Sequence, residues 1–389
     1  MIILIFRYVR RIVVSNLTYS VYWSIPTLFL YLTIIFLSYS VDAGKYRFII
    51  SNRLNPKNYD VRFFIIAAIL IFFKSFGITG RDIVNGYYVN FSEATSIDSY
   101  PDQSVEIGFI ILNVIVKNVF NSYEMLLIII GVITVAPVLY IIKKYSDKIG
   151  VGLALLLYTS IYYFSGFSAT RQYTALSICL LVFDAIYEKK YTKSIGLLLL
   201  ASSFHFSSIL MIVPYFIILS NYLGKRFVRR FVIIFFLLVF LAIYTFRDSL
   251  GVVLIGRYSI YSIAEEINIG FRCFVYYIPI IFFIFYVIKK QKIHDNRFDM
   301  LAIIMISLGF FLGMMEYIVS IFGRLEAITL PFVIIIPYYI KQFAVTKRKK
   351  RVCNFLVFFY CLSRFIIFIV DNYNQQDLMP YRNILGFTI

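Results

Sequence analysis

The chain has 389 residues, of which 61% are hydrophobic and 15% charged, and its formal net charge is +18. A soluble domain is about 45–50% apolar and about 25% charged, so this chain has too few charges to cover a soluble surface. The same hydrophobicity excludes intrinsic disorder. We therefore predict an all-α polytopic integral membrane protein. The excess of Lys and Arg then sets orientation in the membrane and does not indicate a nucleic-acid partner.

Several stretches are apolar enough to form spanning helices, which need about 20 residues each. They are 24–41, 61–78, 124–142, 149–164, 172–187, 231–246, 273–288, 300–319, 327–340 and 352–370. Together with an unusual segment at 194–219, they predict about 10–12 transmembrane helices. No internal repeat or linker divides the sequence, which predicts a single integral membrane domain, 1–389.

Basic loops assign the two sides of the membrane, because Lys and Arg concentrate in cytoplasmic loops. Basic clusters occur at 143–148, 189–193, 225–230, 289–292 and 347–351. On the opposite side we place two periplasmic loops, 80–123 and 247–272, together with 165–171 and the C-terminal stretch 371–389. The stretch from Glu106 to Phe120 is too short and polar to span, and predicts an interfacial amphipathic helix. The first 22 residues and the loop 45–62 are both basic although a single candidate span separates them, so the side of the first 22 residues stays open.

The segment 194–219 is flanked by basic residues on both sides, and its centre, Ser202–Ser208, is polar. Either it enters and leaves on the cytoplasmic side as two short helices, or it crosses once against the charge rule. We favour the broken or re-entrant form, which is tolerated where it lines protein or a water-filled cavity. His205 at its centre is a functional candidate, since ionisable groups at that depth are costly. The alternative is a histidine that hydrogen-bonds to its serine neighbours for packing.

Arginines lie at the outer ends of different spans, at Arg171, Arg257 and Arg324. Arginine binds phosphate through two parallel hydrogen bonds, and the diphosphate of a lipid-linked substrate lies at that depth. The alternatives are that Arg171 extends to the interface as an anchor and that Arg324 pairs with Glu316.

The outer segment 80–91 combines charged, amide and aromatic side chains, among them Asp82 and Tyr87. Such a mixture suits sugar recognition, although a solvated loop would have a similar composition. The sequence contains no nucleotide-binding, zinc-protease or serine-hydrolase motif. With only two histidines, we predict neither a metal site nor a cofactor.

Short motifs follow one another in the order known from one family. They are Gly80-Arg81-Asp82 with Tyr87, Glu106-Ile107-Gly108-Phe109 with Leu112-Asn113, Arg171-Gln172, and Phe204-His205-Phe206-Ser207 with Pro214. This pattern, from Lys74 to Pro214, resembles the EpsG-like, Wzy-type family of bacterial polysaccharide polymerases. The family usually has an arginine shortly before the first motif, where this chain has Lys74 at a longer spacing.

The resemblance implies an inner-membrane glycosyltransferase that polymerises polyprenyl-diphosphate-linked oligosaccharide units at the periplasmic face, for a surface polysaccharide such as O-antigen. Asp82 or Glu106 would deprotonate the acceptor hydroxyl, and Arg171 would neutralise the departing diphosphate without a metal. His205 would donate to the diphosphate or orient the arginine. Candidates for substrate binding are Tyr87, Gln172, Arg257 and Arg324. The partners implied are the lipid-linked substrate, membrane lipid and a chain-length regulator protein.

Two other functions compete with this one. A transporter or flippase of lipid-linked oligosaccharide would also need a cationic cavity, but transporters often show internal repeats, and none is visible here. A ligase-like or acyl-transferring membrane enzyme would usually have one enlarged outer loop, which this chain lacks.

Overall fold

A computed structural model describes residues 25–41, 47–50, 57–101, 105–212, 230, 234, 271–290, 296–316, 321–344, 346–371 and 377–388. This part of the chain is predominantly helical, as predicted. It departs from an all-α fold in one short antiparallel ribbon, β1 (Arg47–Ile50) with β2 (Lys57–Asp60). Phe48, Ile49 and Tyr59 in this ribbon are residue types that favour strands.

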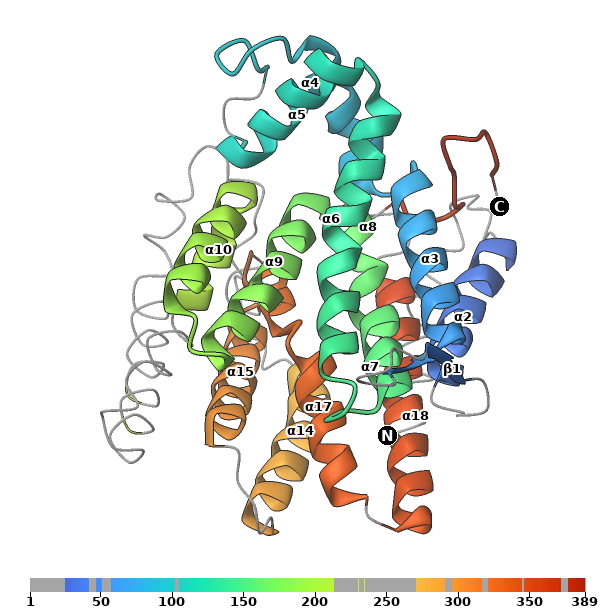
Figure 1. The fold of residues 1–389 in the computed structure, drawn as a ribbon, viewed down its shortest axis with the longest axis vertical. Coiled ribbons are helices and arrows are strands. Elements are labelled where there is room, and N and C mark those ends of the chain that lie inside the picture. Colours follow the sequence, from blue (N-terminus) through green and yellow to red (C-terminus); the bar gives the residue numbers. More distant parts are fainter. Residues whose placement is uncertain are drawn as a thin grey trace. The chain divides into compact units, whose positions relative to one another are not determined.

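The chain divides into two compact units, 1–174 with 344–389, and 175–343. The helices of the first unit are α2 (Ile25–Ser40), α3 (Val61–Phe76), η2 (Ile83–Tyr87), α4 (Tyr88–Glu93), α5 (Ile107–Phe120), α6 (Tyr123–Lys144), α7 (Val151–Leu157), η3 (Tyr158–Tyr163), α8 (Ser165–Ser168), the start of α9 (Thr170–Tyr187) and α18 (Lys347–Asp371). Helices α3 and α6 lie side by side (Figure 1). Gly131 of α6 permits this approach, because a Cβ there would lie 2.5 Å from the Cα of Ser75. Small residues allow membrane helices to pack closely in the same way.

The second unit contains the rest of α9 with α10 (Tyr191–Phe204), η4 (Phe206–Met211), α14 (Phe271–Lys290), α15 (Asn296–Met315), α16 (Ile321–Leu325), η6 (Glu326–Thr329) and α17 (Phe332–Phe343). Its core is aromatic: the rings of Phe298 and Tyr338 lie 4.1 Å apart, and Phe183 meets Phe298 edge-on. The phenol of Tyr277 packs against Gly309, where a Cβ would lie 2.7 Å from the ring.

Nearly every predicted span coincides with a helix or a helical pair of the structure. Among the described residues, two helices are long and apolar enough to cross a membrane, Tyr123–Lys144 and Lys347–Val370, and several shorter apolar helices accompany them. The predicted span 231–246 falls outside the described residues. The total number of spans, their sides and the single-domain organisation stay predictions. The basic cluster 347–351 differs from expectation, because it forms the first turns of α18.

Candidate functional site

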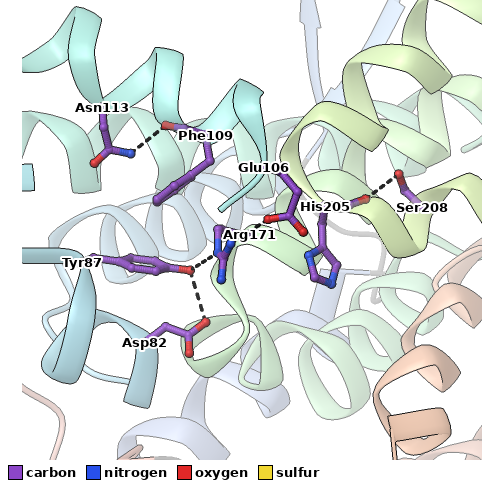
Figure 2. A network of polar contacts seen from close by, with 8 residues as sticks. All are labelled: Asp82, Tyr87, Glu106, Phe109, Asn113, Arg171, His205 and Ser208. Carbon is purple, nitrogen blue, oxygen red and sulfur yellow. Dashed lines mark hydrogen bonds and ion pairs between the residues drawn. The ribbon is translucent and has the colours of Figure 1, made fainter. Parts of the chain in front are cut away.

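Arg171 lies in the first turn of α9, where side chains from three segments of the first unit meet (Figure 2). Its Nη1 donates to the Glu106 carboxylate, with 2.6 Å between Nη1 and Oε2. Its Nε donates to the Tyr87 hydroxyl at 3.2 Å. The Arg171 side chain keeps 19% of its surface exposed, and that of Glu106 keeps 11%. The ion pair is therefore largely shielded from water but keeps some exposed surface.

Tyr87 joins this ion pair to Asp82. Its hydroxyl donates to Oδ2 of Asp82 at 3.2 Å and accepts from Arg171. Burial, and then the nearby Asp82 carboxylate, raise the pKa of Tyr87 well above its usual value. The phenol therefore stays protonated and can hold both neighbours at once.

Two aromatic rings support the guanidinium. The Cζ of Arg171 lies 5.9 Å from the ring centre of Tyr87 and 5.7 Å from that of Phe109. The two ring centres are 4.9 Å apart, and both residues are buried. A cation over aromatic faces is held electrostatically and in a fixed orientation.

The start of α5 explains how Glu106 reaches Arg171. Glu106 is the extended N-cap residue, and its carbonyl accepts from the backbone N–H groups of Phe109 and Ile110. Its carboxylate makes no capping bond and extends to the guanidinium. Glu106, Phe109 and Asn113 lie on one helix face, because residues three and four apart are neighbours. Asn113 is fully buried and donates to the Phe109 carbonyl at 2.7 Å.

Lys74 fixes the segment that leads into Arg171. Its amine is buried on α3 and donates to the carbonyl of Gly166 at 2.8 Å and to Oγ1 of Thr170 at 3.2 Å. It also lies 4.6 Å from the ring centre of Phe167. The sequence raised Lys74 only for its place before the first motif; a lysine within an apolar run was the signal for a buried role.

The other predicted residues are placed as follows. Gln172 follows Arg171 and is buried. His205 lies at the break between α10 and η4, in an extended conformation, and belongs to the second unit. Its carbonyl accepts from the Ser208 hydroxyl at 2.9 Å, so this serine bonds to the backbone of His205 (Figure 2). A site shared by His205 and Arg171 stays a prediction. Arg257 and the side chain of Arg324 lie outside the described residues.

The predicted broken segment is present as a break in the helix. Helix α10 ends at Phe204, and a 3₁₀ helix follows His205. Its re-entrant path stays a prediction, and residues beyond Ile212, including Pro214, fall outside the described part. In the same part, no group of His, Cys, Asp and Glu side chains could hold a metal ion.

The arrangement offers a carboxylate, a guanidinium and a phenol within hydrogen-bonding distance of one another. The guanidinium and the carboxylate are 2.6 Å apart at their closest atoms. Such a cluster can accept a proton at Glu106 and bind an anion at Arg171.

No curated protein and no solved structure matches this chain. The model of the EpsG family matches residues 60–383, which include Lys74, Asp82, Tyr87, Glu106 and Arg171. Because this match covers most of the sequence, the chain belongs to the EpsG family.

Proposed function

We propose that this protein is a glycosyltransferase that polymerises polyprenyl-diphosphate-linked oligosaccharide units at the periplasmic face of the bacterial inner membrane. The family supports a role in polysaccharide synthesis, and the apolar helices support a membrane location. The observation that carries the proposal is the contact of Arg171 with Glu106, which joins an anion-binding group to a proton acceptor.

The reaction needs one bond to form and one to break at the anomeric carbon of the growing chain. A hydroxyl oxygen of the incoming unit attacks this carbon, and its proton passes to Glu106. The bond between the anomeric carbon and the diphosphate oxygen breaks, and the polyprenyl diphosphate departs with the electron pair. Arg171 stabilises the negative charge that develops on the leaving group.

The two roles are compatible because Arg171 has more donors than its present partners use. One Nη1 bond goes to Glu106 and the Nε bond to Tyr87, and the remaining N–H groups can bind phosphate oxygens. As a diphosphate binds, it competes with Glu106 for the guanidinium. This competition weakens the ion pair and makes the carboxylate available as a base.

Asp82 has a supporting role in this mechanism. Its carboxylate accepts a hydrogen bond from the Tyr87 hydroxyl, which leaves the phenol oxygen oriented toward Arg171. We therefore assign the base to Glu106 and the orientation of Tyr87 to Asp82.

The test is deletion of the gene followed by complementation, with gel analysis of surface polysaccharide. Polymerase loss collapses the ladder to a single-unit band, whereas flippase loss removes all units. We expect Glu106→Gln to leave the single-unit band at unchanged protein level, because an amide cannot accept the proton. Glu93→Gln is the matched control, since Glu93 lies exposed at the end of α4. A normal ladder from Glu106→Gln would exclude Glu106 as the base.

A further inference from the structure

The C-terminal segment 377–388 pairs through its backbone with the segment that leads to Asp82. The N–H of Ile78 donates to the carbonyl of Arg382 at 2.8 Å, and the N–H of Ile384 donates to that of Phe76 at 2.9 Å. Gly77 and Asn383 form an antiparallel bridge between these two bonds. The end of the chain therefore adds a strand-like partner to the turn after α3.

Side chains reinforce this pairing. The Thr79 hydroxyl accepts from the N–H of Arg382 at 2.8 Å and donates to its carbonyl at 3.2 Å. Tyr381 is almost fully buried, and its hydroxyl donates to the carbonyl of Phe73 at 3.0 Å. Its N–H donates to the hydroxyl of Thr27 at 3.1 Å. The C-terminal segment is thus attached to both α2 and α3.

Gly80 is held between this segment and the loop before α9. Its N–H donates to the carbonyl of Asp377 at 2.9 Å. Its φ is +111°, and a Cβ there would lie 2.1 Å from the carbonyl oxygen of Phe167. Only glycine fits this conformation and this contact. Gly80 precedes Asp82 by two residues, and Phe167 precedes Arg171 by four. The contact between Gly80 and Phe167 therefore links the segment of Asp82 to the segment of Arg171.

We infer that the C-terminal segment 377–388 is a positioning element of the site, and that it faces the same side of the membrane. The segment holds the backbone of Phe76–Gly80 in place. This fixes the position of Asp82 at the start of η2, and with it the position from which Tyr87 contacts Arg171. This inference rests on the proposed function only where polymerisation kinetics are measured. The pairing of the C-terminal segment with Phe76–Gly80 can be tested without activity.

The first experiment changes Thr79 and measures polymerisation by the purified full-length protein on a lipid-linked repeat unit. Thr79→Val removes the two hydrogen bonds that hold Arg382, and we expect the resulting displacement of the site to lower kcat roughly tenfold. We expect KM to change little, because Thr79 itself contacts no substrate. Thr79→Ser restores the hydroxyl and should restore kcat. Leu385→Ala is the control, since Leu385 is 56% exposed in the same segment.

A structural loss alone would lower the amount of folded protein and leave the kcat of the remainder unchanged. A wild-type kcat for folded Thr79→Val would therefore overturn the inference. So would a failure of Thr79→Ser to recover activity while folding normally.

The second experiment needs no activity. Ile78→Cys with Arg382→Cys places thiols on paired strands, and we expect a short bifunctional thiol reagent to join them in intact membranes. Phe387→Cys and Tyr88→Cys, at sites that are 62% and 60% exposed, should react with a membrane-impermeant reagent from the same side. The four native cysteines are buried and give a low background.

Labelling from opposite sides, or no cross-link, would overturn the inference whatever the protein catalyses. A cross-link and same-side labelling in a protein without polymerase activity would instead reject the proposed function and retain the pairing.

Discussion

The start of α9 and the break after α10 contain the two residues that the sequence favoured most, and the structure holds them differently. At the start of α9, side chains from η2, α5 and α9 converge on Arg171 through hydrogen bonds, an ion pair and aromatic contacts. At the break, the backbone of His205 is bonded on both sides: its N–H donates to the Ala201 carbonyl, and its carbonyl accepts from the Ser208 hydroxyl.

Arg171 is thus the centre of a cluster of side chains, whereas His205 marks a break in a helix. Side chains that converge from distant segments define a place where charge is organised, which is what the departure of a diphosphate leaving group in the proposed reaction requires. A helix break in a membrane protein exposes backbone groups and needs local partners such as serine hydroxyls. We therefore expect substitutions of Arg171 to affect the reaction more than substitutions of His205.

The largest effect is expected from Arg171→Ala. Loss of a donor to a developing negative charge costs about 10²–10³ in rate, so the polysaccharide ladder should collapse to the single-unit band. Arg171→Lys should also fail, because a lysine ammonium lacks the planar fork that places separate N–H donors on Glu106, Tyr87 and the diphosphate. The measurement is ladder length at matched protein levels. Near-normal polymer from Arg171→Lys would reduce Arg171 to an interfacial anchor.

The sequence predicted the helices of this region well, because their signals are local. Apolar length located α3 and α6, and the change from Glu106 to an apolar run located α5. Arg171 and Glu106 were both predicted for the site, but nothing local shows that residues 65 apart form an ion pair. The pairing of Thr79 with Arg382, across 303 residues, left no trace in periodicity or charge. Long-range contacts of this kind follow from packing, which a single sequence does not display.

A second, smaller effect is expected from Lys74→Met. This variant fills about the same space but removes the amine that bonds Gly166 and Thr170. The backbone that leads into Arg171 is then held less firmly. Misplacement by about 1 Å can cost up to 10²-fold, and we expect a loss of roughly tenfold. The protein should remain folded, because the Gly166 carbonyl still accepts from the Thr170 hydroxyl. Thermal stability in detergent and ladder length should therefore change independently; wild-type polymer from folded Lys74→Met would contradict this role.

His205→Ala tests whether the imidazole of His205 takes part in the reaction. If His205 contacts the diphosphate, its loss should lower polymerisation about 10²-fold, as for other acid–base groups. If its role is confined to the helix break, we expect a smaller reduction of about five- to tenfold, since a typical hydrogen bond contributes about 1–1.5 kcal/mol. Ser208→Ala serves as the comparison, because it removes the bond to the His205 carbonyl and leaves the ring. Equal effects of both variants would assign the role to the break, whereas a much larger effect of His205→Ala would assign it to the imidazole.

The smallest effect is expected from Tyr87→Phe, which keeps the ring against Phe109 and removes only the hydroxyl between Asp82 and Arg171. Of the two lost hydrogen bonds, the one from Arg171 bears on the leaving group, and the guanidinium keeps its bond to Glu106. Loss of one bond of about 1 kcal/mol corresponds to a rate reduction of roughly fivefold. Polymer should remain, with a shifted length distribution. Tyr88→Phe is the matched control, since Tyr88 is the next residue and is 60% exposed. If Tyr87→Phe instead removed all polymer, the phenol would take part in proton transfer, and the network would need Tyr87 as a reacting group beside Glu106.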